Sequence, residues 1–374
     1  MIKLKNFMSI KFVNLKRQYL EDRKEIIKSF DKISKSGNFI LGKDLEIFEK
    51  IFAKNCNKRY AVGLNSGSDA IFLTLFSLNL KKNDEVIIPS ISFVATAWAV
   101  ANINCKLIFC DVDSDLNINL EDLKKKINKK TKVIIPVHLT GRVCKIDKIK
   151  KIIPKKVMIL EDAAQAFGAY YKDKPAGSFG FAAAFSLNPL KNLHVFGDGG
   201  VLVTNSKKLY DDLIKIRNHG LKKNIAQELG FNSRLDTIQA AIGNIKLKKI
   251  KKRIIKTRKF AQIYNSKLNP KLTLPKFQKF EKPVFHRYII ICNSKYERNS
   301  LMRHLKKNNI QSNINYGLPL YNHPAFKKFK NKNLQNTEFL CPRILSLPLY
   351  PEMKMNELTK VINCINNYFK HIKR

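Results

Sequence analysis

The feature that most constrains the fold of this 374-residue chain is a regular alternation of short apolar segments with helix-length segments between about residues 60 and 205. The helix-length segments include 69–80 and 94–101. The expected strands are 60–64, 85–89, 106–110, 132–137, 157–160, 183–187 and 201–204. Strands that alternate with helices build a parallel or mostly parallel sheet covered by helices. We therefore expect an α/β fold with ligands bound beyond the carboxyl ends of its strands.

The pattern changes in the last third of the chain. Apolar residues from Leu235 to Ile245 recur at intervals of three and four, which predicts a helix that continues through the basic stretch 246–259. From about residue 270 we expect a strand at 284–292, a helix at 297–308 and a final helix near 355–370. These elements indicate a second, smaller α+β domain.

Composition argues against several classes of protein. Hydrophobic residues make up 44% of the chain, yet no apolar run approaches the roughly 20 residues of a membrane helix. The basic segment 1–8 precedes no signal-peptide core, so we expect a cytoplasmic protein without a membrane partner. Seven scattered cysteines, without a CxxC pair, and seven histidines, without ligand spacing, favour neither a disulfide framework nor a metal site.

The formal net charge is +42, from 71 basic and 29 acidic residues. Clustered cations would indicate nucleic-acid binding, because they release counterions from phosphate. Here the lysines are spread along the whole chain, and no nucleic-acid-binding signature accompanies them. We interpret them as a solvated surface whose positive field attracts anionic small substrates.

A lysine between two expected strands is the first candidate for chemistry. Lys191 follows the apolar segment 183–187 and precedes a glycine turn at 197–200. Burial at the edge of a core lowers the pKa of a lysine amine and makes it a nucleophile toward a carbonyl group. Taken alone, Lys191 fits a surface lysine better, so its companions decide the interpretation.

The first companion is a carboxylate at the end of an expected strand. Glu161 and Asp162 directly follow the apolar segment 157–160. A buried carboxylate needs a cationic partner, and the protonated ring nitrogen of pyridoxal phosphate (PLP) is such a partner. The alternative is that one of the two carboxylates caps the following helix.

The other companions could hold a phosphate and a planar ring. Gly67 and Ser68 open an apolar helix directly after a strand, where free backbone N–H groups bind phosphate. Phe93 follows another strand and could stack on a ring, although a core position explains it equally well. Ser186, five residues before Lys191, could add a phosphate contact. Together these residues supply every contact that PLP requires.

With these motifs the chain resembles the DegT/DnrJ/EryC1/StrS family of PLP-dependent sugar aminotransferases. The resemblance runs from about Phe12 to the end of the chain, and its motifs are 38–42, 65–70, 136–141, 161–165, 185–193, 197–200, 232–241 and 347–349. It implies the aspartate-aminotransferase-like fold, fold type I. It also implies an N-terminal arm and large PLP-binding domain over 1–255, and a small C-terminal domain over 256–374. The family pattern begins near Met8, so we interpret residues 1–7 as an extension or a misplaced start.

The resemblance implies a role for each matching residue. Lys191 would form the imine link to the cofactor and shuttle protons, and Asp162 would pair with the pyridinium nitrogen. Gln165 would reach the phenolic oxygen, and Asn232 the phosphate in the neighbouring subunit, which implies a homodimer with shared active sites. The implied cofactor-binding residues are Gly67, Ser68, Phe93, Asp162, Gln165, Ser186, Asn188, Lys191 and Asn232. Weaker candidates for the sugar site are His138, Asn188, His219, Tyr316 and His323.

We therefore predict that the enzyme transfers an amino group from glutamate to a nucleotide-linked keto-sugar, as a step of amino-sugar or polysaccharide biosynthesis. The dehydratase branch of the family carries histidine at the lysine position, and Lys191 argues against it. A cyclitol or other non-nucleotide keto substrate stays open, as does a non-catalytic regulatory or nucleic-acid-binding protein on the same fold. Two residues depart from the family pattern: Phe181 replaces an aspartate, and Gly317 a proline.

Overall fold

A seven-stranded mixed sheet forms the centre of the computed structural model, which describes residues 9–329 and 334–371. The proposed extension at residues 1–7 lies outside this part of the chain. The strand order is β1 (Tyr60–Leu64), β9 (Gly200–Thr204), β8 (Ala182–Ser186), β5 (Met158–Asp162), β4 (Thr131–Ile134), β2 (Glu85–Pro89) and β3 (Lys106–Cys110). Strand β9 is antiparallel to both of its neighbours, and the other pairs are parallel. The predicted α/β class with a mostly parallel sheet is confirmed.

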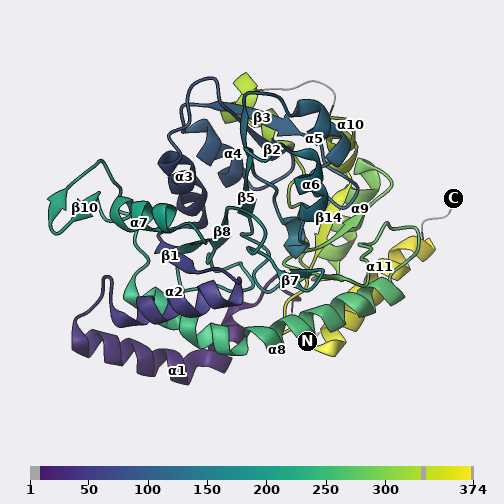
Figure 1. Ribbon diagram of the computed structural model, residues 1–374. Helices are drawn as coiled ribbons and strands as arrows, with labels where there is room; N and C mark the ends of the chain where they lie inside the picture. The colour runs from purple at the N-terminus through teal and green to yellow at the C-terminus, as the bar shows by residue number, and fades with distance from the viewer. Residues whose placement is uncertain (1–8, 330–333, 372–374) are drawn as a thin grey trace.

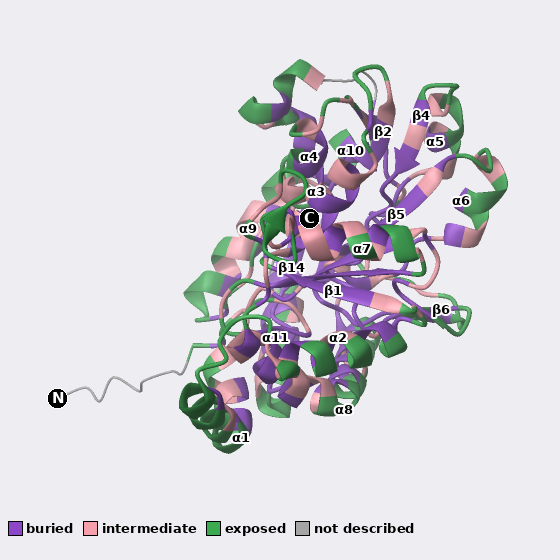
Figure 2. Ribbon diagram, turned by 60° about the vertical axis from the view of Figure 1, so that its left-hand side comes forward, coloured by how far each residue is buried: buried purple, intermediate pink, exposed green. Residues whose placement is uncertain are grey.

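Helices cover both faces of this sheet. One face packs against α3 (Gly67–Ser77), α4 (Val94–Ala101) and α7 (Lys207–Ile216). The other carries α2 (Lys43–Asn55) and α8 (Thr237–Lys267), with α5 (Leu120–Lys126) and α6 (Ile146–Ile152) toward β3 and β4. Figure 1 shows α1 (Leu15–Ser36), α2 and α8 on one side of the sheet, and Figure 2 shows buried strands between helices with exposed outer faces.

A smaller core lies at the far end of α8. It contains β13 (Tyr288–Ile291) paired antiparallel with β14 (Ile344–Leu347), and the helices α9 (Lys295–Lys307) and α11 (Met355–His371). Along α8, Ile250 and Ile254 pack in the core of the large sheet, whereas Phe260 and Tyr264 pack in the smaller core. We propose that the domain boundary at 255/256 lies at this change of core, within a continuous helix.

Several elements were not predicted, and two predicted strands are shorter. The expected strand 132–137 ends at Ile134. The expected strand 284–292 begins only at Tyr288, because Phe285 has a left-handed φ of 51°. The helices α1, α2 and α7 and the strand β14 were also not predicted from the sequence. The short unpredicted elements are β6 (Tyr170–Tyr171), β7 (Lys174–Pro175), β10 (Leu221–Lys222), β11 (Ile225–Ala226), β12 (Glu281–Lys282), α10 (Gln335–Leu340) and the 3-10 turns Leu139–Gly141, Leu320–Asn322 and Pro324–Phe329. The β10–β11 hairpin projects from the body of the molecule (Figure 1).

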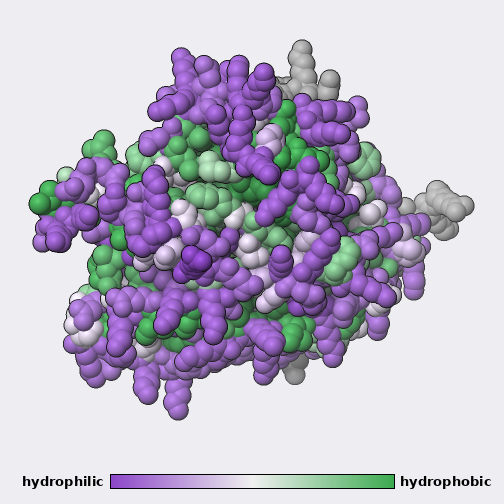
Figure 3. Space-filling model, in the orientation of Figure 1, coloured by the Kyte–Doolittle hydropathy of each residue, from purple (hydrophilic) through white to green (hydrophobic). Residues whose placement is uncertain are grey.

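Hydrophilic side chains cover most of the face seen in Figure 3, with apolar side chains exposed between them. The sequence supplies the charged part of this surface through its 71 basic residues. Within the described segments, none of the helices combines the length and apolar character needed to cross a membrane.

Candidate active site

The site begins with two strands that end side by side. Strands β5 and β8 are parallel neighbours, and Asp162 pairs in register with Ala184, two residues before Ser186. Alternate residues of a strand point to the same face. Leu160 and Ala184 pack in the core beneath α3 and α4, so Asp162 and Ser186 emerge on that same face at the carboxyl edge of the sheet.

These strand ends open into a cavity of about 450 Å³. Eight of the nine cofactor-binding residues predicted from the sequence line it, and so does one predicted sugar-site residue. They are Gly67, Ser68, Phe93, Asp162, Gln165, Ser186, Asn188 and Lys191, and Tyr316 joins them. They come from separate strand ends and loops, so the fold brings together residues that lie up to 249 positions apart in the chain, from Gly67 to Tyr316.

Asp162 is held in a fixed position by two hydrogen bonds. Its Oδ2 accepts from the Thr96 hydroxyl at 2.7 Å, and its Oδ1 accepts from the backbone N–H of Ala164 at 3.1 Å. The Thr96 hydroxyl also lies 2.9 Å from that of Ser92. A carboxylate fixed in this way can face a cationic ring nitrogen without changing its rotamer.

Its neighbour Glu161 points to the opposite face and has a structural role. It accepts backbone hydrogen bonds from Gly177, Phe179 and Gly180, and it lies 2.9 Å from Nε2 of His138. Burial works to raise the pKa of Glu161, but these hydrogen bonds and His138 outweigh it and lower the pKa. The alternation of the strand therefore separates the two carboxylates into one that faces the cavity and one that holds a loop.

The Lys191 amine is suited to nucleophilic chemistry. Burial lowers its pKa to about 8, against the opposing charge of Asp162 and with a smaller contribution from the nearby charge of Arg287. Within the part of the chain that is described, the amine has no hydrogen bond or ion pair. The backbone of Lys191 is held instead, because its N–H donates to the Asn188 carbonyl at 2.8 Å and its carbonyl lies 3.0 Å from Nδ1 of His194.

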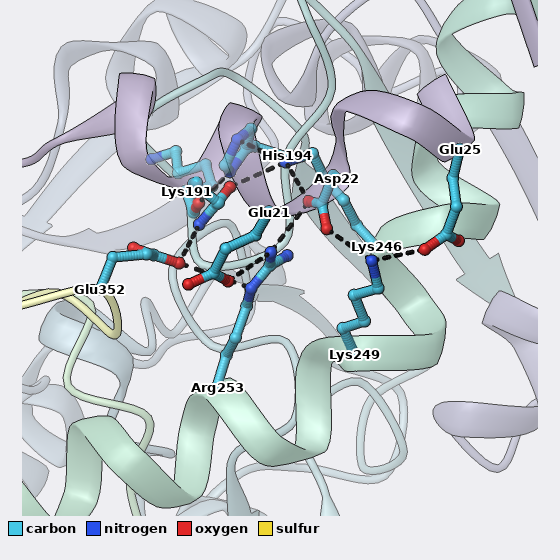
Figure 4. A network of polar contacts seen from close by, with 10 residues as sticks. Glu21, Asp22, Glu25, Lys191, His194, Lys246, Lys249, Arg253 and Glu352 are labelled. Carbon is cyan, nitrogen blue, oxygen red and sulfur yellow. Dashed lines mark hydrogen bonds and ion pairs between the residues drawn. The ribbon is translucent and has the colours of Figure 1, made fainter. Parts of the chain in front are cut away.

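Behind Lys191 lies a buried polar network that joins its loop to α1 and α8 (Figure 4). Nε2 of His194 lies 3.0 Å from the Lys246 amine, which also donates to Gln18 at 2.8 Å. Asp22 accepts from Arg253 at 2.8 Å and from Lys249 at 2.9 Å. Burial and the nearby Lys246 charge lower the pKa of His194 to about 3, so its ring is neutral and can accept from Lys246. The network supports the loop from the side away from the cavity.

The opposite end of the cavity has the form of a phosphate cradle. The first residue of α3 is Gly67, and a Cβ built there would lie 2.7 Å from the Ser186 Cβ. A Cβ on Gly200 would lie 2.2 Å from the backbone of Ser66. Only glycine allows these backbones to approach so closely. The N-terminus of α3 therefore presents its N–H groups to the cavity beside the Ser68 and Ser186 hydroxyls, an arrangement that binds phosphate.

Four predicted site residues lie outside this cavity. His138 is fully buried beside Glu161, on the other side of β5. His219 is exposed near the β10–β11 hairpin, and His323 packs against Phe326. Asn232 is exposed and bridges Asn218 in an isolated backbone pair. The roles of these four residues stay predictions that the geometry of a single subunit does not support directly.

Among the residues of the cavity wall that were not predicted from the sequence, three carry polar groups of interest. Thr96 orients Asp162, while Arg287 and Asn315 bring buried polar atoms without partners. For Arg287 a signal exists, because a polar His-Arg pair interrupts the otherwise apolar run 284–292. Thr96 and Asn315 carry no such signal. Groups of three metal-ligating side chains are absent from residues 9–329 and 334–371.

The residues present fit PLP. The cradle at Gly67 suits its phosphate, Asp162 suits its ring nitrogen, and the free Lys191 amine suits its aldehyde. This combination defines an enzyme that works through a lysine and a phosphate-bearing ring cofactor.

Comparison with known proteins identifies the family. A model of the DegT/DnrJ/EryC1/StrS aminotransferase family matches residues 20–366, and the chain belongs to this family. It is 34% identical to a "Pleiotropic regulatory protein" of Geobacillus stearothermophilus, over 97% of this chain and 100% of the relative. It is 33% identical to a dTDP-3-amino-3,6-dideoxy-alpha-D-galactopyranose transaminase of Aneurinibacillus thermoaerophilus, over 96% and 99% of the two chains.

Two solved structures support the same conclusion. DesV of S. venezuelae, solved in complex with a ketimine intermediate, matches with a TM-score of 0.93 and 32% identity over 98% of this chain and 100% of that one. NtdA of Bacillus subtilis, solved with its bound cofactor PMP, matches with a TM-score of 0.90 and 28% identity over 99% and 87%. The chain is therefore a PLP-dependent aminotransferase, as the sequence predicted.

Proposed function

We propose that this enzyme transfers the amino group of glutamate to a nucleotide-linked keto-sugar, as a step of amino-sugar biosynthesis. The observation that carries the proposal is the meeting of a free Lys191 amine, the fixed Asp162 and the Gly67 cradle in one cavity. Relatives named as transaminases of dTDP-linked and UDP-linked sugars support the choice of acceptor.

Each of these residues has a distinct task in this reaction. When bound, PLP supplies an electron sink for charge that develops on the substrate carbon. Lys191 has a pKa of about 8, so near neutral pH it can accept a proton from the donor carbon as a general base and donate it again as a general acid. Asp162 keeps the ring nitrogen protonated, and its bonds to Thr96 and Ala164 hold it in place. Ser186 and the N-terminus of α3 anchor the phosphate end.

Other substrates and roles within the family are less well supported. A keto-cyclitol would use the same cofactor residues, so the cavity alone does not separate it from a keto-sugar. A regulatory role is suggested by the name of the Geobacillus relative. The presence of eight predicted cofactor residues in one cavity favours an enzyme, because a purely regulatory protein does not need a free, buried lysine amine.

The direct test is a screen of acceptors. The PLP-loaded protein would be incubated with glutamate and with dTDP-, UDP- and GDP-linked keto-sugars, together with one keto-cyclitol, and 2-oxoglutarate and the aminated product would be measured by mass spectrometry. We expect about one equivalent of 2-oxoglutarate without an acceptor and sustained turnover with at least one nucleotide-linked sugar. Turnover with the cyclitol alone would contradict the proposed substrate class.

We further propose a homodimer in which Asn232 reaches the active site of the partner subunit. Asn232 is exposed and outside the cavity of its own subunit. Large apolar side chains are also exposed on the N-terminal segment, among them Ile27, Phe30 and Ile40, at 46%, 55% and 47%. Exposed apolar side chains in such number are typical of an interface.

Subunit complementation tests the shared site. Lys191→Ala and Asn232→Ala would each be inactive alone, but a coexpressed mixed dimer would contain one complete site. Random pairing should then restore about a quarter of the wild-type activity, because half of the dimers are mixed and each has one working site of two. An absence of complementation in a mixture shown by light scattering to be dimeric would contradict the proposed role of Asn232.

A further inference from the structure

Arg287 is a buried cation in the cavity wall without an acidic partner. Arg287 is only 9% exposed, and it directly precedes β13. Its Nη1 donates to the carbonyl of the neighbouring His286 at 3.0 Å, whereas its buried Nε has no hydrogen-bond partner. The guanidinium also stacks over the Phe12 ring at 5.1 Å. A large part of its bonding capacity is therefore unused.

Two other buried arginines are neutralised by acids, whereas buried Arg298 also lacks an ion pair but donates to Asn299 and lies outside this cavity. Arg217 pairs with Glu49, and Arg253 pairs with Asp22 at 2.8 Å. Arg287 forms no ion pair with any Asp or Glu of the described segments. A buried charge without a partner costs several kcal/mol, so proteins retain one mainly where a ligand supplies the opposite charge. This points to an anion-binding subsite.

The position of Arg287 indicates which anion it binds. Arg287 and Lys191 line the same cavity, and they are close enough that the charge on Arg287 lowers the pKa of Lys191. In an amino acid the α-carboxylate is bonded to the carbon whose proton Lys191 must remove. In a nucleotide-linked sugar, the sugar ring separates the diphosphate from the carbon that receives the amine. An anion held close to Lys191 therefore fits a carboxylate better.

We propose that Arg287 binds the α-carboxylate of the amino-acid donor. The proposal rests on the proposed aminotransferase reaction. A guanidinium presents paired N–H groups that match the two oxygens of a carboxylate, which fixes the orientation of the bound amino acid as well as its charge. The donor's α-carbon would thereby be directed toward the Lys191 amine. A diphosphate of the acceptor is the competing source of anionic oxygens.

The test is a binding measurement on the PLP-loaded protein. Isothermal titration calorimetry would use 2-methylglutamate, which lacks the α-proton and cannot complete transfer, and in a parallel arm dTDP and UDP. Arg287→Gln removes the cation, Arg287→Lys keeps the charge without the paired geometry, and the exposed Arg303→Gln is a control for net charge. Removing Arg287 leaves no buried acid unpaired, so we expect the variants to fold and to retain their cofactor absorbance.

We expect Arg287→Gln to weaken 2-methylglutamate binding by roughly 10- to 100-fold and Arg287→Lys to recover part of the loss, with nucleotide binding unchanged. Weakened nucleotide binding with unchanged 2-methylglutamate binding would assign Arg287 to the acceptor and overturn the proposal. Unchanged binding of both would also overturn it. If the wild type binds 2-methylglutamate through Arg287 but aminates no acceptor in the screen, the proposed function fails while the carboxylate site stands.

Discussion

Two groups of buried cations lie on opposite sides of the Lys191 loop, and they differ in their partners. On the network side, Lys246 contacts Gln18, His194 and Asp22, and Arg253 is paired with Asp22. On the cavity side, the Lys191 amine and the Nε of Arg287 have no partner within the described residues. Burial lowers the pKa of Lys191 and of Lys246 alike, to about 8.

The comparison shows that a shifted pKa alone does not identify a reactive lysine in this protein. The amines of Lys191 and Lys246 are buried and equally shifted, but only Lys191 has unused bonding capacity and access to a cavity. A satisfied cation stabilises the packing of α1 on α8, whereas an unsatisfied one is available to a ligand. Substitutions on the two sides should therefore have opposite consequences for activity and for folding.

The largest expected effect is on activity, from the cavity side. Lys191→Ala removes the nucleophile and the proton shuttle, so single-turnover release of 2-oxoglutarate should fall by roughly four orders of magnitude or more. The midpoint of urea unfolding should not decrease, because no partner of Lys191 is left unpaired. Lys248→Ala, an exposed position on α8, is the control. Retained transamination in Lys191→Ala would remove the basis of the comparison.

The next largest effect is on stability, from the network side. Asp22 is fully buried, and Asp22→Asn leaves Lys246 without its anion and removes the shortest of the three ion pairs of Arg253, which should cost about 3–5 kcal/mol in the free energy of unfolding. Urea denaturation measures this loss. The exposed Asp31→Asn, on the same helix and paired with Lys35, should change the stability by less than about 1 kcal/mol. Equal effects of the two substitutions would show that the network contributes no more than a surface pair.

A comparison of the wild type with Asp22→Asn also measures how the stability of the network depends on pH. Burial raises the pKa of Asp22, but hydrogen bonds from Lys249 and Arg253 outweigh it, so the pKa is lowered overall. A lowered carboxyl pKa contributes stability above its unfolded value of about 3.9, and this contribution is lost as the pH falls through the folded pKa. The stability difference between wild type and Asp22→Asn should therefore shrink on acidification below about pH 4.

The smallest expected effect concerns the amine of Lys191 in the apoprotein. Its pKa of about 8 means that half of the amine is neutral at that pH, whereas fewer than about one in a hundred ordinary lysine amines are. Competitive acetylation with peptide mapping should show Lys191 reactivity rising with a midpoint near pH 8, and exposed Lys248 rising near its ordinary value. Coincident profiles for the two lysines would contradict the effect of burial on Lys191.

Much of the large sheet could be predicted because its strands are short apolar runs between helices. Strands β1, β2 and β3 have the predicted bounds, and β5, β8 and β9 begin or end within two residues of them. The two-residue strands such as β6 and β7 are too short to show any periodicity. The antiparallel direction of β9 also has no local signal, because it depends on the path of the connecting loop.

The residues of the candidate site likewise fall into those that the sequence could predict and those that it could not. Lys191, Asp162 and Ser186 stand in local motifs at strand ends, where the chemistry of the residue and its position in the fold agree. The sequence marks Arg287 only as a cation within an apolar run, and its role could not be assigned because that role depends on the partner that it lacks in the folded chain. The link between Gln18 and Lys246 spans 228 positions, and only packing of α1 on α8 creates it.

The strand order has a consequence for synthesis of the protein. Among the described residues, the only neighbour of β1 in the sheet is β9, which begins at Gly200 and is the last of the seven strands to leave the ribosome. Until then β1 remains an unpaired apolar edge for the time needed to translate about 140 residues, long enough to require protection from aggregation. Chains released before residue 204 cannot complete the sheet, so truncated products should be cleared or insoluble rather than partly active.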